Sequence, residues 1–253
     1  MTYCLAITVD EGLVMCSDSR TSAGVDQVST YSKMHSFGVD GERQLILLSA
    51  GNLATTQSVL NQLRRDMEDP EAEQSLMSVV DLPEAADYLG RISREQQTKH
   101  LDQSSQADFN PEASFILGGQ IADQPHGIYM IYPQGNHITT SEHTRFLQIG
   151  ESKYGKPILD RIVGKDTSLE DAARCALVSM DSTTHSNVTV GPPFELLIYK
   201  AGSLKLDKFV CLKADSPYLK KLKDAWDAKV KEAFAELPKI SRKALRPRGN
   251  GCA

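Results

Sequence analysis

Four groups near the start of the chain have the chemistry to cleave an amide bond together. Thr2 carries a hydroxyl, Asp18 a carboxylate and Lys33 an ammonium group, and the backbone N–H of Gly51 can stabilise an oxyanion. A threonine hydroxyl is a weak nucleophile that needs a base, and the free α-amine of an N-terminal threonine can be that base. This amine titrates near ~7.7–8.0, so a useful fraction is neutral at cellular pH. Because Thr2 has a small side chain, we expect a methionine aminopeptidase to remove Met1, which would leave Thr2 with this free amine.

The alternative interpretation is that these residues form no common site. Many chains begin with Met-Thr, and a lysine and an aspartate most often form an exposed ion pair that contributes little. The surrounding strand pattern favours a site instead. Residues 2–9 are rich in β-branched and apolar side chains, residues 10–12 predict a hairpin turn that ends in glycine, and residues 13–16 return as a second strand. This hairpin would bring Asp18 back towards Thr2.

The next predicted elements carry the other two groups. A third strand over residues 32–37 contains Lys33, and a fourth over residues 44–50 is a buried apolar run that ends at Gly51. A helix over residues 52–67 follows directly. Backbone N–H groups at such a strand-to-helix junction can stabilise an oxyanion, so Gly51 is the candidate donor.

The rest of the chain alternates between strand and helix patterns. Further strands are predicted over residues 114–122, 127–132, 146–149, 194–200 and 209–213. Further helices are predicted over residues 84–101, 156–163, 168–181 and 216–236. This order indicates an α+β protein but permits several α+β folds. We expect one domain over residues 1–236 and a basic, flexible tail over residues 237–253.

Composition argues against several other classes of function. The 253 residues carry a net charge of −5 and an isoelectric point of about 5.7, so nothing indicates nucleic acid binding. No apolar run is long enough for a membrane span, and the start lacks the features of a signal peptide. The five cysteines and six histidines show no metal or redox spacing, so no metal or cofactor is expected. We expect a cytoplasmic protein in which Cys4 and Cys16 are small buried hydrophobes.

The motifs described above resemble those of the proteasome β-type threonine peptidases. That family has an N-terminal threonine, which matches Thr2, and an Asp-Ser-Arg after the first hairpin, which matches residues 18–20. It also has a lysine on the next strand, which matches Lys33, and a glycine that closes the fourth strand, which matches residues 50–51. The resemblance extends along most of the chain. The opening Met-Thr-Tyr, the Asp-Glu-Gly-Leu-Val hairpin and the Ser-Ala-Gly-Asn-Leu run look most like the bacterial Anbu group, the ancestral β subunit.

The resemblance implies a fold and a division of roles. The fold would be the four-layer αββα sandwich of the N-terminal nucleophile hydrolases. Thr2 would attack the scissile carbonyl and form an ester that water then hydrolyses. Lys33 would favour the neutral amine and the developing alkoxide, and Asp18 would keep Lys33 charged and oriented.

Further residues are assigned through the same resemblance. The family's Asp-x-x-Ser after its fourth helix corresponds to Asp181 and Thr184, and Ser186 is the rival for the hydroxyl because the following segment is longer here. Arg20 is expected to bond turn carbonyls rather than take part in catalysis. The residues implied around the substrate side chain indicate no preferred class of side chain; they are Thr21, Tyr31, His35, Ser49 and Leu53.

The predicted function is that of a threonine peptidase that acts on peptides or unfolded proteins within a self-compartmentalised homo-oligomer, either a ring or an open spiral. Enclosure would shield other proteins, since no leader is expected to mask Thr2. If ATP drives the system, a separate ATPase partner would hold it, because the chain lacks a P-loop. Two alternatives stay open. One is a hydrolase of a single small amide, and the other is a catalytically silent structural subunit, against which the intact Thr2, Asp18 and Lys33 argue.

Overall fold

The computed structural model describes residues 1–22, 28–103 and 109–240. Its internal contacts divide the chain into two compact units, Met1–Ala214 and Asp215–Ala253. The division falls inside the domain predicted over residues 1–236, whose extent stays a prediction. All the candidate site residues lie in the first unit.

Within the described residues, the first unit contains two five-stranded antiparallel sheets and one two-stranded sheet. The first sheet has the order β10 (Phe146–Gly150), β1 (Tyr3–Val9), β2 (Gly12–Asp18), β11 (Phe194–Lys200) and β12 (Phe209–Leu212). The second has the order β5 (Met34–Val39), β6 (Arg43–Gly51), β7 (Ala113–Ile121), β8 (Gly127–Ile131) and β9 (His137–Thr139). The small sheet pairs β3 (Arg20–Ser22) with β4 (Val28–Thr30).

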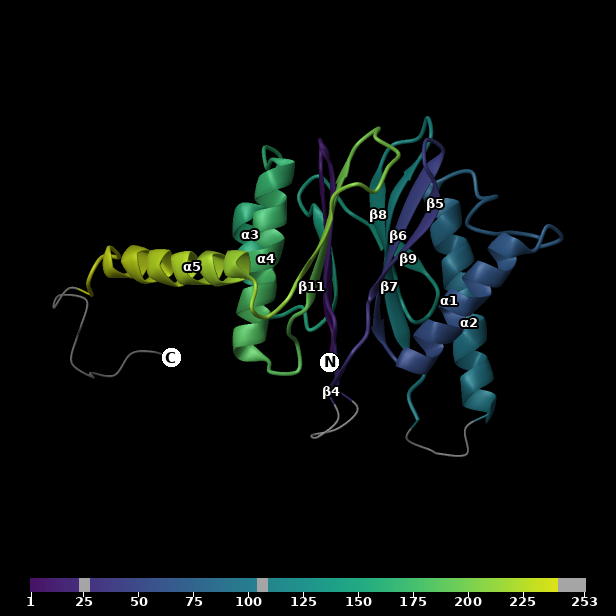
Figure 1. Ribbon diagram of the computed structural model, residues 1–253, viewed down its shortest axis with the longest axis horizontal. Helices are drawn as coiled ribbons and strands as arrows, with labels where there is room; N and C mark the ends of the chain where they lie inside the picture. Colours follow the sequence, from purple (N-terminus) through teal and green to yellow (C-terminus); the bar gives the residue numbers. More distant parts are fainter. Residues whose placement is uncertain (23–27, 104–108, 241–253) are drawn as a thin grey trace, which may run out of the picture. The chain divides into compact units, whose positions relative to one another are not determined.

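Figure 1 shows the two five-stranded sheets face to face, with helices on both outer sides. The helices α1 (Leu53–Glu68) and α2 (Leu82–Gln103) lie over the second sheet. The helices α3 (Lys156–Ile162) and α4 (Leu169–Ser186) lie on the side of the first sheet, where α4 packs on β1, β2 and β11. The α+β class predicted from the sequence is confirmed.

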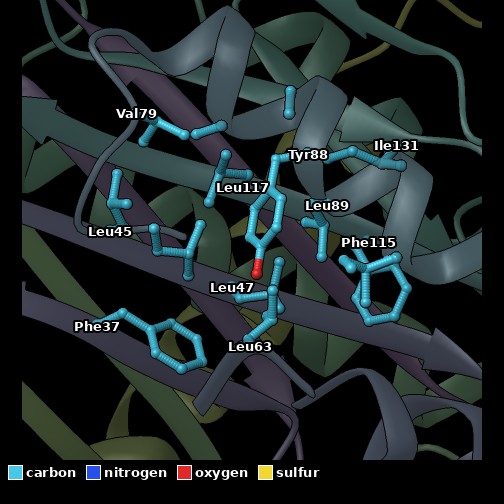
Figure 2. Close-up of a cluster of buried hydrophobic side chains, with 14 of the residues drawn as sticks. Phe37, Leu45, Leu47, Leu63, Val79, Tyr88, Leu89, Phe115, Leu117 and Ile131 are labelled. Carbon is cyan, nitrogen blue, oxygen red and sulfur yellow. The ribbon is translucent and has the colours of Figure 1, made fainter. Parts of the chain in front are cut away.

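The strand β6 supplies side chains to two cores. Leu45 and Leu47 join the cluster under α1 and α2 (Figure 2), whereas Ile46 and Leu48 join a cluster that draws on both large sheets. Successive strand residues point to opposite faces, so a strand that is buried on both faces is apolar at nearly every position. Burying each of these side chains contributes about 1.5–3 kcal/mol to stability, which anchors the strand that ends at Gly51.

The β1–β2 hairpin fixes the position of Asp18. Cys4 pairs with Ser17, so Asp18 lies opposite the start of β1. The predicted turn is confirmed, and Gly12, which follows it at the start of β2, has φ +149°. A Cβ at Gly12 would lie 1.9 Å from the Tyr199 carbonyl oxygen, so glycine also lets β11 pair directly with β2.

The second unit contains α5 (Pro217–Ala235), whose first turn is capped by the Ser216 hydroxyl, which accepts a hydrogen bond from Leu219 N–H. None of its residues is buried. Most of the predicted basic tail, residues 241–253, lies outside the described residues. Among the described helices, none combines the length and apolarity needed to cross a membrane.

Several predicted boundaries are wrong. The short strands β3, β4 and β9 had no prediction, because three residues are too few for a periodic pattern. The fourth helix was predicted to end at Asp181 but continues to Ser186. Thr183 and Thr184 donate their hydroxyls to the carbonyls of Ser179 and Met180 four residues earlier, which lets both threonines remain helical. Asp181 and Thr184 therefore lie within the helix and not after it.

Candidate active site

The backbone carbonyl of Thr2 is held closely. Thr2 lies just before β1 and is partly exposed, and its carbonyl accepts a hydrogen bond of 2.7 Å from Glu151 N–H. Gly150, at the end of β10, has φ +80°, and a Cβ there would lie 2.0 Å from the Thr2 carbonyl oxygen. Only glycine permits this approach, so β10 fixes Thr2 at the end of the first sheet.

Asp18 is a fully buried carboxylate with three donors. Its Oδ1 accepts hydrogen bonds from Tyr3 N–H at 3.0 Å and from Lys33 Nζ at 2.7 Å, and its Oδ2 accepts from Gly191 N–H at 3.3 Å. Burial raises the pKa of Asp18, and the Lys33 ammonium and the two backbone donors act in the opposite direction. Asp18 thus ties the residue after Thr2 to Lys33.

Lys33 precedes β5, and its side chain is only 8% exposed. Its Nζ donates to Asp18 at 2.7 Å and to the Arg20 carbonyl at 2.6 Å. An ammonium group has three N–H donors, so one remains after these two bonds. Lys33 and Thr2 line the same small cavity, and the third N–H is therefore available to groups in it.

The cavity, of about 40 Å³, brings together residues that are distant in sequence. Besides Thr2 and Lys33 it is bordered by Gly51, the predicted oxyanion donor. Gly51 has φ +111°, and a Cβ on it would lie 2.4 Å from the Glu112 carbonyl oxygen. The next residue, Asn52, caps α1 by accepting a hydrogen bond from Thr55 N–H, so the strand-to-helix junction predicted at Gly51 is present. Four of the five predicted substrate-side residues also border the cavity: Thr21, Tyr31, Ser49 and Leu53.

The chain as a whole is similar to known proteins. The family model for the proteasome subunit matches residues 2–198. The chain belongs to the proteasome subunit family. Among solved structures it is similar to Anbu (ancestral beta-subunit) from Yersinia bercovieri, with 43% identity over 95% of this chain and 99% of that one and a TM-score of 0.89. It is equally similar to the Anbu complex of Pseudomonas aeruginosa, described as a helical assembly, with 43% identity over 96% and 99% of the two chains and a TM-score of 0.90.

Anbu from Hyphomicrobium sp. strain MC1 is a third similar structure, with 37% identity over 95% of this chain and 100% of that one and a TM-score of 0.87. No curated protein matches the chain. The family and the Anbu likeness suggested by the sequence motifs are therefore confirmed.

Two predicted catalytic residues of this proteasome-family chain do not border the cavity. Asp181 and Thr184, in the last turns of α4, are absent from its lining, as is the rival Ser186. The Thr184 hydroxyl donates to the Met180 carbonyl at 3.0 Å. The roles of these three residues stay predictions. Arg20 behaves as expected, since its Nη1 donates to the Val188 carbonyl at 2.6 Å.

Sequence reasoning missed Glu195, which lies between two buried residues of β11. Its Oε2 accepts hydrogen bonds from the hydroxyls of Ser17 at 3.1 Å and Ser32 at 3.0 Å, and from Lys33 N–H at 3.4 Å. One carboxylate oxygen thus links β2, β11 and the segment that carries Lys33. The sequence contained one sign of this role, which is a single carboxylate within the apolar run Phe-Glu-Leu-Leu-Ile. Because successive strand residues point to opposite faces, Glu195 points away from the face of its two neighbours.

Tyr3, the residue after Thr2, was also missed. Its ring is fully buried, and its hydroxyl shares a hydrogen bond of 2.7 Å with the Ser179 hydroxyl and accepts another of 2.5 Å from Gln148 Nε2. Burial raises the pKa of the Tyr3 phenol, which therefore stays protonated. A Cβ at Gly155 would lie 2.4 Å from the Tyr3 oxygen. Tyr3 thus joins β1 to α4 and β10 next to Thr2.

None of the described cysteines borders this cavity. Cys4 and Cys16 are fully buried free thiols, as predicted, and burial raises the pKa of both. Among the described residues, no three His, Cys, Asp or Glu side chains are grouped so that they could hold a metal ion.

Proposed function

We propose that this chain is a threonine-type peptidase of the N-terminal nucleophile class, which hydrolyses peptide bonds with Thr2 after Met1 has been removed. The observation that carries the proposal is the buried pair of Lys33 and Asp18, 2.7 Å apart, whose lysine lines the same cavity as Thr2. Desolvating a lysine and an aspartate is costly and rarely serves stability alone. At the edge of a cavity that also contains a threonine, such a pair is suited to activating the hydroxyl.

The proposed reaction has two steps. The Thr2 hydroxyl attacks the carbonyl of the scissile bond, its proton passes to the α-amine and then to the leaving amine, and an ester forms on Thr2. Water, deprotonated by the same amine, hydrolyses the ester and regenerates the hydroxyl. Lys33 stabilises negative charge on the Thr2 oxygen, Asp18 orients Lys33, and the backbone N–H of Gly51 faces the carbonyl oxygen as it becomes negative.

The same proposal extends to the fold type and the assembly. Two sheets between two pairs of helices support the four-layer αββα sandwich of this class. The helical assembly described for the Pseudomonas aeruginosa Anbu complex supports a homo-oligomer, either a ring or an open spiral. Its substrates would be peptides or unfolded proteins. We place the protein in the cytoplasm. If ATP drives the system, a separate ATPase partner would supply unfolded chains.

Intact-mass measurement tests the proposal. The purified protein should lack the mass of Met1 and gain the mass of one inhibitor when it is treated with a peptidyl epoxyketone or β-lactone. Thr2→Ala should abolish the gain, whereas Thr8→Ala, on the strand that follows Thr2, should leave it unchanged. An active protein that retains Met1 in full, or labelling that survives Thr2→Ala, would refute the proposal.

A further inference from the structure

A second and larger pocket adjoins the cavity at Thr2. Its volume is about 410 Å³, which is within the range of small-ligand sites. The two hollows share four wall residues, which are Tyr31, Ser32, Leu53 and Thr56. An acyl group carried on Thr2 would therefore have this pocket beside it. We call it the side-chain pocket.

The side-chain pocket contains one permanently charged group. Its wall includes Arg64 of α1 and no aspartate or glutamate. Within the described part of the chain, the Arg64 guanidinium has no ion-pair or hydrogen-bond partner, whereas Arg43 and Arg145 each pair with a carboxylate. An arginine presents five N–H donors in a planar fork that fits a carboxylate. The pocket therefore offers an uncompensated positive charge.

Neutral polar groups surround Arg64 in this wall. Nε2 of His35 is buried and has no hydrogen-bond partner among the described residues. Burial, with a smaller contribution from the Arg64 charge, lowers the pKa of His35 to about 4, so its ring is neutral near pH 7. The side-chain amides of Gln57 and Asn61 complete the polar lining. All three can donate hydrogen bonds, and a buried group without a partner favours a ligand that provides one.

We propose that the side-chain pocket receives an acidic side chain, glutamate or aspartate, from the residue whose carbonyl is attacked by Thr2. Arg64 binds the carboxylate, and His35, Gln57 and Asn61 donate to its remaining lone pairs. This substrate class rests on the proposed peptidase function. It goes beyond the sequence motifs, because Gln57, Asn61 and Arg64 carry no sequence signal of substrate binding. They lie at helical spacing on α1, and the fold brings His35 of β5 to the same pocket.

Covalent labelling provides the test. We compare three peptidyl epoxyketones that differ only in the residue next to the reactive group. This residue is glutamate, glutamine or leucine. The measured quantity is the rate at which each probe adds its mass to the intact protein. We expect the glutamate probe to react at least about tenfold faster than the glutamine probe, because a hydrogen bond between charged groups is stronger than a neutral one. The ratio should fall as salt is raised, since Arg64 is exposed to solvent.

Two variants of neighbouring arginines make the test specific. Arg64→Gln should bring the glutamate-to-glutamine ratio close to one. Arg65→Gln removes the same charge from the next residue of α1, which does not line the pocket, and should leave the ratio unchanged. Arg64→Glu should make a fourth probe, with lysine next to the reactive group, react faster than the glutamate probe.

The outcomes separate the two proposals. If no probe labels Thr2 in the wild-type protein, the peptidase function fails and the acidic preference fails with it. If the leucine or glutamine probe labels Thr2 as fast as the glutamate probe, the function stands and the acidic preference is wrong. A ratio that Arg64→Gln and Arg65→Gln lower equally would show a general charge effect and would also overturn the role of Arg64.

Discussion

The catalytic cluster, defined as Thr2, Asp18 and Lys33, differs from the side-chain pocket around His35 and Arg64 in how tightly each is bonded. Both Asp18 oxygens and two of the three Lys33 donors have partners in the protein. In the pocket, His35 Nε2 and the Arg64 guanidinium have none among the described residues. The groups of the catalytic cluster are therefore held in place by the fold. The groups proposed to select a substrate have hydrogen-bonding capacity left for a ligand.

This difference has a physical reason. A reacting group displaced by about 1 Å can lose a hundredfold in rate, so its position must be set before the substrate arrives. A group that recognises a side chain contributes most when its hydrogen bonds are completed by the ligand. The cluster is accordingly held by two sheets and their loops, whereas the pocket depends on long side chains of α1.

Removing Lys33 should have the largest effect on activity, because it removes the charged group of the catalytic cluster next to Thr2. Lys33→Ala is expected to lower kcat/KM for a peptide substrate by about 10²–10⁴-fold, because the charge beside Thr2 is lost. It leaves Asp18 buried without its main partner, which costs about 3–5 kcal/mol of unfolding free energy, within the range a folded domain tolerates. Combined with Thr2→Ala, the loss of activity should not be additive.

A matched lysine gives the control for this prediction. Lys156 forms an exposed ion pair with Asp160. Lys156→Ala should change the unfolding free energy by less than about 1 kcal/mol and leave turnover intact. Turnover by Lys33→Ala at the wild-type rate, in protein shown to be folded by circular dichroism, would contradict the catalytic role.

Replacing Glu195 should disturb the catalytic cluster less, because it alters the hydrogen bonds around Lys33 and keeps all three residues of the cluster. Glu195→Ala removes the acceptor that holds Ser17, Ser32 and the Lys33 backbone, so we expect kcat to fall by about 10- to 100-fold with little change in KM. Glu195→Gln retains a carbonyl oxygen for these three donors and should recover most of the activity. A glutamine variant as slow as the alanine variant would show that the charge of Glu195 matters and its hydrogen bonds do not.

The sequence predicted the parts of this site that depend on local pattern. The β1–β2 hairpin, the apolar run of β6 and the junction at Gly51 follow from side-chain alternation and glycine placement, and together they bring Thr2, Lys33 and Gly51 to one cavity. The end of α4 was predicted too early, because Thr183 and Thr184 are weak helix formers in isolation. Their bonds to carbonyls four residues earlier and the packing of α4 on β1 and β2 reverse that preference.

The rest of the site depends on contacts between segments far apart in sequence. Glu195 meets Lys33 from 162 residues away, and Tyr3 meets Ser179 from 176 residues away. The partners of such residues are set by tertiary packing and leave no local period. Arg64 is similar, since on the helical pattern alone it is one more charged residue on an exposed face.

The smallest effect we predict concerns the pH dependence of stability. The pKa of His35 is lowered from 6.5 to about 4 by burial and by Arg64. Between these values the unfolded chain binds a proton at His35 that the folded chain does not, so unfolding free energy must fall as pH falls through this window. His35→Gln removes this term while keeping a polar side chain. The wild-type Tm should therefore drop by a few degrees more than that of His35→Gln between pH 6.5 and pH 4, measured by scanning calorimetry. Parallel curves of Tm against pH for the two proteins would mean that the His35 ring has a hydrogen-bond or charge partner in solution. The catalytic cluster and the side-chain pocket would then no longer differ in how completely their groups are bonded.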